Sequence, residues 1–199
     1  KTKVMSECIE LFYDPNFLSK LDSQPHLIGF ENGVFDLESY EFRDGCPEDY
    51  ISFSTKCDYI HYNENDIKIR EVYNFMKQIH TNQELREYTL LLMASFLDGR
   101  CYEQKFHFWL GNGANGKSTL VELFEDSLGD YAASAPNTIL TRPRGNSSNA
   151  NPEIAKLKGK RFVHTQETEA TDQLHVGYLK ELTGGDKIIA RELYKAPVQ

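Results

Sequence analysis

The chain has 199 residues, of which 40% are hydrophobic and 12% are aromatic, a composition typical of a folded globular protein and not of a disordered one. Its formal net charge of −8 at pH 7 argues against a protein that coats nucleic acid over its whole surface. No run approaches the roughly 20 uninterrupted apolar residues of a membrane-spanning helix, so no membrane partner is expected.

The cysteines and histidines are scattered along the chain. The four cysteines and six histidines form no C-x-x-C pair or other metal-ligand spacing, so a zinc site is not expected and the thiols are expected to be reduced. We therefore expect an intracellular, reducing location. The sequence starts at Lys1 without Met and without a signal-peptide pattern, so we expect it to be part of a longer polypeptide.

The first 65 residues are expected to form a small α+β region. Residues 4–21 contain two short helical patterns, interrupted at Asp14-Pro15. Asn32-Gly33 is a tight-turn signal between two strand-like runs. Strands are expected over residues 27–30, 33–37, 40–43 and 50–53. We assign no catalytic role to this region.

Helical periodicity starts at Asp66. Apolar residues recur at helical spacing through residues 69–79 and again through residues 85–97. Thr81 or Asn82 is a suitable cap for the second helix, and Gly99 is expected to end it. Residues 66–100 therefore predict a helical hairpin whose aromatic and Met positions serve packing.

A phosphate-binding pattern, G-x-x-x-x-G-K-[ST], follows this hairpin. Its nine residues are Gly111, Asn112, Gly113, Ala114, Asn115, Gly116, Lys117, Ser118 and Thr119. Small residues let the backbone curl so that its N–H groups point at a phosphate chain. Lys117 can then reach the outer phosphates, and the Ser118 hydroxyl can bind Mg²⁺. We expect a nucleoside triphosphate site here.

The flanks of this loop have the order that such a site requires. The aromatic-rich residues 105–110 predict a strand before the loop, and the apolar spacing after it predicts a helix over residues 118–128 that stops at Gly129. The alternative is a purely structural turn between a strand and a helix. The order of strand, loop and helix favours the nucleotide site.

Hydrolysis also needs carboxylates that hold the metal and orient water. Residues 160–167 predict a second strand, and Glu167 and Glu169 stand at its end, where this fold class places such groups. Their i, i+2 spacing in an extended chain puts both on one face. Glu167 is the expected Mg²⁺ ligand, although the sequence leaves open which glutamate orients water. The alternative is two solvent-facing glutamates.

Several motifs together are similar to those of one family. They are residues 106–120, 157–163, 167–169 and 179–186, with Arg191 and Tyr194 beyond. The chain resembles the superfamily 3 helicases, among them most the primase-helicases of large DNA viruses and related phage and plasmid replication proteins. Residues 27–50 resemble the N-terminal helicase-associated region of that family. The block Lys-x-x-Thr-Gly-Gly-Asp discriminates best, because ordinary phosphate-loop kinases lack it.

This resemblance implies an α/β fold with a phosphate-loop AAA+-like ATPase module, which is C-terminally incomplete in this sequence. The module would occupy residues 101–199, preceded by an N-terminal helicase-associated α+β region at residues 1–65 and a helical hairpin at residues 66–100. The family's sensor residue and arginine finger would lie beyond Gln199.

The resemblance also implies an activity and partners. It implies ATP and Mg²⁺ as cofactors, with Lys117, Glu167 and Glu169 as catalytic residues. It implies a homo-oligomer, a hexameric ring, that translocates on single-stranded DNA with other replication proteins. For a viral protein the location would be the host cytoplasm or nucleus.

DNA contacts are expected near the C-terminal end. Residues 142–199 hold ten Lys and Arg against seven Asp and Glu, although basic segments are usually just solvated. In the family a DNA-contacting β-hairpin follows the Gly-Gly-Asp block, which implies Lys187, Arg191 and Lys195 as contacts. Surface charge on an edge hairpin is the alternative.

Two other functions stay open. A kinase could use the same phosphate loop to phosphorylate a small acceptor, with a turnover of ATP that is indifferent to DNA. A non-enzymatic, nucleotide-gated module for ring assembly or loading could use ATP only to close a ring.

Overall fold

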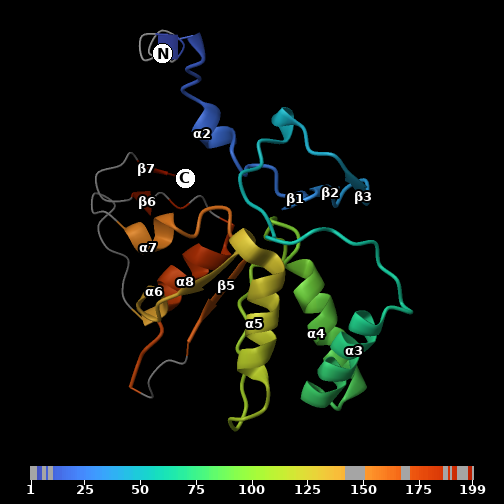
Figure 1. The fold of residues 1–199 in the computed structure, drawn as a ribbon. Coiled ribbons are helices and arrows are strands. Elements are labelled where there is room, and N and C mark those ends of the chain that lie inside the picture. Colours follow the sequence, from blue (N-terminus) through green and yellow to red (C-terminus); the bar gives the residue numbers. More distant parts are fainter. Residues whose placement is uncertain are drawn as a thin grey trace.

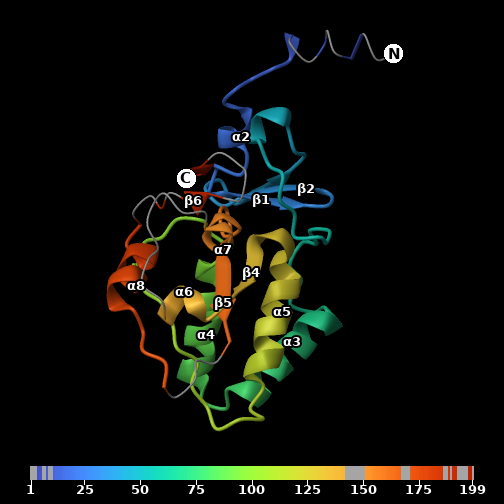
Figure 2. The same cartoon turned by 90° about the vertical axis from the view of Figure 1, so that its left-hand side faces the viewer.

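The computed structural model describes residues 4–5, 8, 11–141, 151–166, 171–185, 188, 190–191 and 197–198. Within these residues the chain is mixed α/β, which confirms the predicted class (Figure 1). A three-stranded antiparallel sheet lies near the N-terminal end, and a two-stranded parallel sheet lies beside the central helix α5 (Figure 2). No helix among the described residues has the length and apolar content to span a bilayer.

The antiparallel sheet is a meander of β1 (Leu27–Phe30), β2 (Gly33–Asp36) and β3 (Glu41–Arg43), in that order. Phe30 pairs with Gly33, so the connection is a two-residue turn. Three of the four predicted strands are therefore confirmed.

The strand predicted over residues 50–53 is wrong. The backbone N–H groups of Ser52 and Phe53 both donate to the Asp22 carboxylate, at 2.7 and 3.0 Å. A side chain thus takes the hydrogen bonds that a neighbouring strand would otherwise accept. The short helix α2 (Phe17–Lys20) precedes this contact, and a 3₁₀ turn, η1 (Pro47–Asp49), lies after β3.

The helical hairpin forms as predicted from α3 (Ile67–Ile79) and α4 (Gln83–Ser95), which pack against each other. Asn82 is the cap of α4, since its side chain accepts from the N–H of Leu85 at 3.0 Å. The helix ends at Ser95 and not at Gly99. At Gly99 the backbone instead comes close to that of Pro25, because the Gly99 N–H donates to the Pro25 carbonyl at 2.9 Å.

The C-terminal half is built around helix α5 (Lys117–Leu128), which ends at Gly129 as predicted. The turn η2 (Gly129–Tyr131) leads into β4 (Ala132–Ala135), and β4 pairs in parallel with β5 (Phe162–Thr165). The remaining elements are α6 (Thr138–Thr141), α7 (Pro152–Ala155), α8 (Val176–Thr183), β6 (Ala190–Arg191) and β7 (Pro197–Val198).

One hydrophobic core joins the three predicted parts of the chain. Its buried members come from the meander, from both helices of the hairpin, from α5, from η2 and from β5, namely Ile28, Met76, Met93, Leu120, Phe124, Leu128, Tyr131 and Phe162. Burial of apolar side chains is the dominant favourable term in folding. The phosphate-loop helix is therefore anchored against elements that precede it by many residues.

Arg161 connects the meander, the end of the helical hairpin and the C-terminal half through polar contacts. Its guanidinium donates to the backbone carbonyls of Leu27 and Leu97 and lies 4.5 Å from the ring centre of Tyr131. The Tyr131 hydroxyl in turn accepts from the N–H of Gly29 at 2.9 Å and donates to the carbonyl of Phe53 at 3.2 Å. Burial lowers the pKa of Arg161 and raises that of Tyr131.

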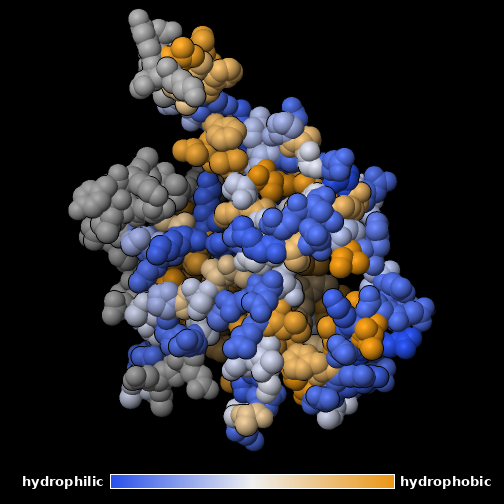
Figure 3. All heavy atoms as spheres, viewed as in Figure 1, coloured by the Kyte–Doolittle hydropathy of each residue, from blue (hydrophilic) through white to orange (hydrophobic). Residues whose placement is uncertain are grey.

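Apolar side chains also gather on the surface. Figure 3 shows them over the hairpin helices and over the N-terminal segment. The most exposed on the hairpin are Ile67 and Leu91, at 70% and 71%, and on the N-terminal segment Leu11 and Phe12, at 81% and 83%. Contiguous apolar surface marks contact with other protein more often than free surface.

An ion pair closes the meander onto η1 and predicts a pH dependence. Arg43 Nη2 lies 2.7 Å from Oδ1 of buried Asp49, and the N–H of Cys46 donates to Oδ2 at 2.8 Å. These bonds hold the pKa of Asp49 well below its usual range. The carboxylate therefore contributes stability above the unfolded-state pKa, near 3.9, that is lost as the pH falls through the folded-state pKa.

Asp49→Asn is expected to lower the free energy of unfolding by about 1–2 kcal/mol at pH 7, and by progressively less below about pH 4. Urea unfolding of both proteins between pH 7 and pH 2 measures this. Glu48→Gln, a neighbouring exposed carboxylate, is the control and should show no such convergence. A penalty for Asp49→Asn that is as large at pH 2 as at pH 7 would contradict the assignment.

Candidate nucleotide-binding site

The phosphate loop lies at the N-terminal end of α5, at the end of the molecule opposite the N-terminal residues (Figures 1 and 2). Gly113, Ala114 and Gly116 have positive φ angles of 79°, 45° and 80°. Anion-binding concavities in proteins are formed by successive N–H groups where right- and left-handed residues alternate. The helix N-terminus adds to the attraction for an anion. Residues 113–116 thus combine left-handed backbone with the start of a helix.

The helical hairpin and the hydrophobic core contact this loop and the first turn of α5. A Cβ atom on Gly116 would lie 2.9 Å from Cγ1 of Ile79, the last residue of α3. The N–H of Leu120 donates to the Gly116 carbonyl at 2.9 Å, and the Leu120 side chain is 2% exposed. The loop therefore packs directly against the end of α3. Sequence reasoning missed this contact, because neither the motif nor its spacing identifies a partner.

Inside the loop, two of its own side chains meet. Lys117 Nζ donates to Asn115 Oδ1 at 2.9 Å. A Cβ atom on Gly111 would lie 1.9 Å from Asn115 Nδ2 and 2.8 Å from Lys117 Nζ, so a larger residue at this position would have to displace these two side chains. Ser118 and Thr119 lie in the first turn of α5, and both are exposed.

The strand predicted over residues 105–110 is wrong. Among the described residues, β5 pairs only with β4, and residues 105–110 join no ladder. Phe108 and Leu110 are 59% and 87% exposed, although Trp109 packs against the main core. The aromatic side chains favour a strand, but a strand also needs a neighbour with free hydrogen-bonding groups.

The second predicted strand is confirmed as β5 and ends at the same end of the molecule as the phosphate loop (Figures 1 and 2). His164 on β5 lies with Nε2 2.8 Å from Oε1 of Glu125 on α5, a contact that joins the strand to the phosphate-loop helix. Glu167 and Glu169, the predicted metal and water groups, lie outside the described residues.

The predicted DNA contacts are described only in part. Lys187 and Lys195 lie outside the described residues, as does the side chain of Arg191. The Arg191 backbone forms the end of β6 and pairs with Pro197 of β7 in an antiparallel ladder. Among the described residues, no group of three or more His, Cys, Asp or Glu side chains is placed to hold a metal ion.

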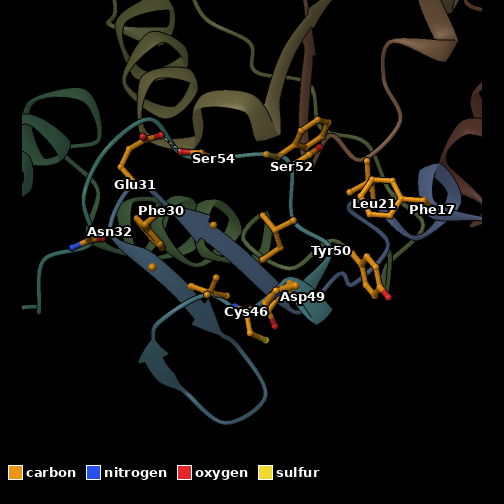
Figure 4. A pocket seen from close by; sticks show the side chains of 17 residues that line it. Phe17, Leu21, Phe30, Glu31, Asn32, Cys46, Asp49, Tyr50, Ser52 and Ser54 are labelled. Atoms are coloured by element: carbon orange, nitrogen blue, oxygen red, sulfur yellow. Dashed lines mark hydrogen bonds between the residues drawn. The ribbon is translucent and has the colours of Figure 1, made fainter. Parts of the chain in front are cut away.

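A separate hollow of about 630 Å³ lies at the meander, away from the phosphate loop (Figure 4). Phe30, Val34 and Ile51 contribute apolar surface to it, and Glu31 and Asp49 contribute carboxylates. None of the described residues that line it is Lys or Arg. Asp49 is already paired with Arg43, and the Glu31 carboxylate disfavours phosphate, so this hollow is a poorer candidate for a nucleotide site than the loop.

A mixed α/β fold with a phosphate-loop pattern at a helix N-terminus is typical of many nucleotide-binding proteins. Comparisons with known proteins point to a smaller group within this class. Residues 1–87 match the family described as "D5 N terminal like". The chain is 46% identical over 198 residues to "Putative helicase L207/L206" of Acanthamoeba polyphaga mimivirus, an alignment that covers 100% of this chain and 21% of that protein.

Two further relatives come from other large DNA viruses. The chain is 34% identical over 194 residues to "Putative helicase 121R" of Invertebrate iridescent virus 3, covering 96% of this chain and 21% of the relative. It is 29% identical over 196 residues to "Putative primase C962R" of African swine fever virus, covering 97% and 20%. The chain thus spans about a fifth of the length of the curated relatives it matches.

These matches support the resemblance to the primase-helicases of large DNA viruses. The D5-type match covers the meander, α3 and the start of α4, and it ends at residue 87, before the phosphate loop. The relatives that align with almost the whole chain extend the similarity across the loop and β5.

Proposed function

We propose that this chain is part of an ATP-dependent DNA helicase that acts in DNA replication, and that its phosphate loop binds the triphosphate of ATP. The observation that carries the proposal is the loop itself: three left-handed residues at the N-terminus of a twelve-residue helix, with Lys117 directed into the loop. The names of the viral relatives support a role in replication.

Each site residue has a role in this proposal. The amides that follow Gly111 hold the phosphate oxygens, and Lys117 neutralises charge on the outer phosphates. The Ser118 hydroxyl and Glu167 are the Mg²⁺ ligands that the donor chemistry suits. Glu169, or Glu167 in its place, orients the attacking water. Mg²⁺, when bound, supplies neutralisation of the charge that develops on the phosphates.

The proposal includes an assembly. A homo-hexameric ring would encircle single-stranded DNA in an intracellular, reducing compartment, with other replication proteins as partners. The exposed apolar faces of the helical hairpin and the N-terminal segment suit contacts with other protein. Lys187, Arg191 and Lys195 are the proposed contacts to the DNA backbone.

We expect the removal of one of these cationic side chains to change the salt dependence of single-stranded DNA binding. Arg191→Ala or Lys195→Ala should weaken the binding of single-stranded DNA by the full polypeptide and reduce the slope of log K against log salt by about 0.7 for each phosphate that is no longer neutralised. Fluorescence titrations over a series of salt concentrations measure the slope. Lys68→Ala, an exposed lysine on α3, is the control. Unchanged slopes in both variants would remove these residues from the DNA interface.

The proposed function is tested by the ATPase rate of the full polypeptide with and without single-stranded DNA. A motor predicts turnover that DNA stimulates and strand separation that requires ATP. If DNA leaves turnover unchanged while a small acceptor becomes phosphorylated, the protein is a kinase. If ATP drives ring closure without turnover, it is a gated assembly module. Either result overturns the helicase proposal.

A further inference from the structure

The Asn115 side chain folds back onto two other residues of the phosphate loop. Its Oδ1 accepts from Lys117 Nζ at 2.9 Å. Its Nδ2 reaches across the loop to Gly111, where it would lie 1.9 Å from a Cβ atom on that residue. The amide therefore fills space beside Gly111 and holds the one side chain of the loop that carries positive charge.

This contact uses the same group that a triphosphate needs. Lys117 presents one ammonium, and in the proposed function that ammonium binds the outer phosphates. A phosphate oxygen carries charge and is a stronger acceptor than a neutral amide oxygen, so it can displace Asn115. The displacement still costs the hydrogen bond between the two side chains. A ligand without an outer phosphate does not recover that cost.

We propose that Asn115 is a latch that holds Lys117 within the loop and is displaced by a nucleoside triphosphate. The proposal rests on the proposed function of the loop and adds a determinant of affinity and specificity. The latch lowers the affinity for every nucleotide that must draw Lys117 away. It lets the triphosphate bind because only the outer phosphates replace the amide oxygen as acceptor.

Substitutions at Asn115 should act in opposite directions. Asn115→Ala removes the competing acceptor, so the full polypeptide should bind a non-hydrolysable ATP analogue about three- to tenfold more tightly. Asn115→Asp puts a carboxylate beside the ammonium and the phosphates, so binding should weaken by at least about tenfold. Asn74→Ala, an exposed asparagine on α3, is the matched control and should bind like the unaltered protein.

The experiment is a fluorescence titration of the analogue with Mg²⁺, extended to millimolar concentrations, for these variants and for Lys117→Ala with and without Asn115→Ala. The latch predicts that Asn115→Ala tightens binding only when Lys117 is present. If Asn115→Ala leaves the affinity unchanged or weakens it, the latch is wrong. If Asn115→Ala tightens binding equally in the Lys117→Ala background, the effect does not pass through the ammonium and the latch is also wrong.

The same titration distinguishes a failure of the latch from a failure of the proposed nucleotide site. Binding that Lys117→Ala weakens while Asn115→Ala leaves it unaltered would overturn the latch and keep the nucleotide site. Binding that is indifferent to Lys117→Ala would overturn both, because the nucleotide would then lie elsewhere. Thermal unfolding of the Asn115 variants should match that of the unaltered protein, since Asn115 is exposed.

Discussion

Replacing Lys117 by alanine is expected to lower the ATP turnover of the full polypeptide by at least about a hundredfold, which corresponds to several kcal/mol of charge stabilisation. The ammonium is held inside the loop at 2.9 Å from Asn115. The amides of the loop can still cradle a phosphate without it, but no other side chain of residues 111–119 carries positive charge. The substitution should therefore affect both binding and turnover.

Steady-state ATPase assays with saturating single-stranded DNA measure this effect. Lys105→Ala is the matched control, because Lys105 is exposed and pairs with Glu103 at 3.2 Å, outside the loop. It should leave turnover within about twofold of the unaltered protein, as surface ion pairs contribute little. A Lys117→Ala protein that folds normally and keeps more than about a third of its activity would remove this loop from the catalytic site.

Removing Arg161 is expected to loosen the joint between the meander, the hairpin and β5. Arg161→Ala leaves the carbonyls of Leu27 and Leu97 without their donor and takes the guanidinium from the face of buried Tyr131. The unsatisfied carbonyls and the bare ring face should together cost about 2–4 kcal/mol of stability. Arg161→Lys should recover part of this, because a single ammonium cannot reproduce the fork of donors.

Native-state hydrogen exchange of the amides in β1 and β5 measures the loss of stability in the full polypeptide. Both strands should lose protection by the same amount, since one side chain holds both. Arg100→Ala is the control, because Arg100 pairs with Asp98 and Glu38 at the surface. Protection that falls in only one of the two strands would show that Arg161 does not couple them.

Much of the fold could be predicted because its signals are local. The caps and apolar spacing of α3 and α4 depend on residues within each helix, and the Gly129 stop of α5 follows from one residue. The tight-turn signal at Asn32-Gly33 locates the turn of the meander to within one residue, since the turn is Glu31-Asn32 and Gly33 begins β2. These features do not depend on which part of the chain packs against them.

The strand predictions fail where residues far away in the sequence determine the local hydrogen bonding. Residues 50–53 have strand-like composition, but Asp22 takes two of their amide hydrogen bonds. Residues 105–110 are equally strand-like, and among the described residues no ladder includes them. Conversely, the Ala-rich β4 does not follow from its composition and forms because β5 lies beside it. Strand formation depends on neighbours more than on intrinsic preference.

In the candidate site, too, the local pattern could be predicted from the sequence and the contacts with other residues could not. The spacing of residues 111–119 is enough to predict a phosphate loop, because the chemistry fixes glycine, lysine and a hydroxyl at set positions. The contact of Ile79 with Gly116 and the fold-back of Asn115 onto Lys117 depend on three-dimensional packing. A motif specifies what the loop can bind, whereas the packing specifies what holds the loop and what competes for it.

The most direct measurement is a crystal structure of the full polypeptide with a non-hydrolysable ATP analogue and Mg²⁺. The account predicts a triphosphate enclosed by the amides of residues 113–119, with Lys117 Nζ moved from Asn115 to an outer phosphate oxygen and a carboxylate of residues 167–169 beside the metal. A nucleotide bound elsewhere, with the loop still closed on its own side chains, would contradict it.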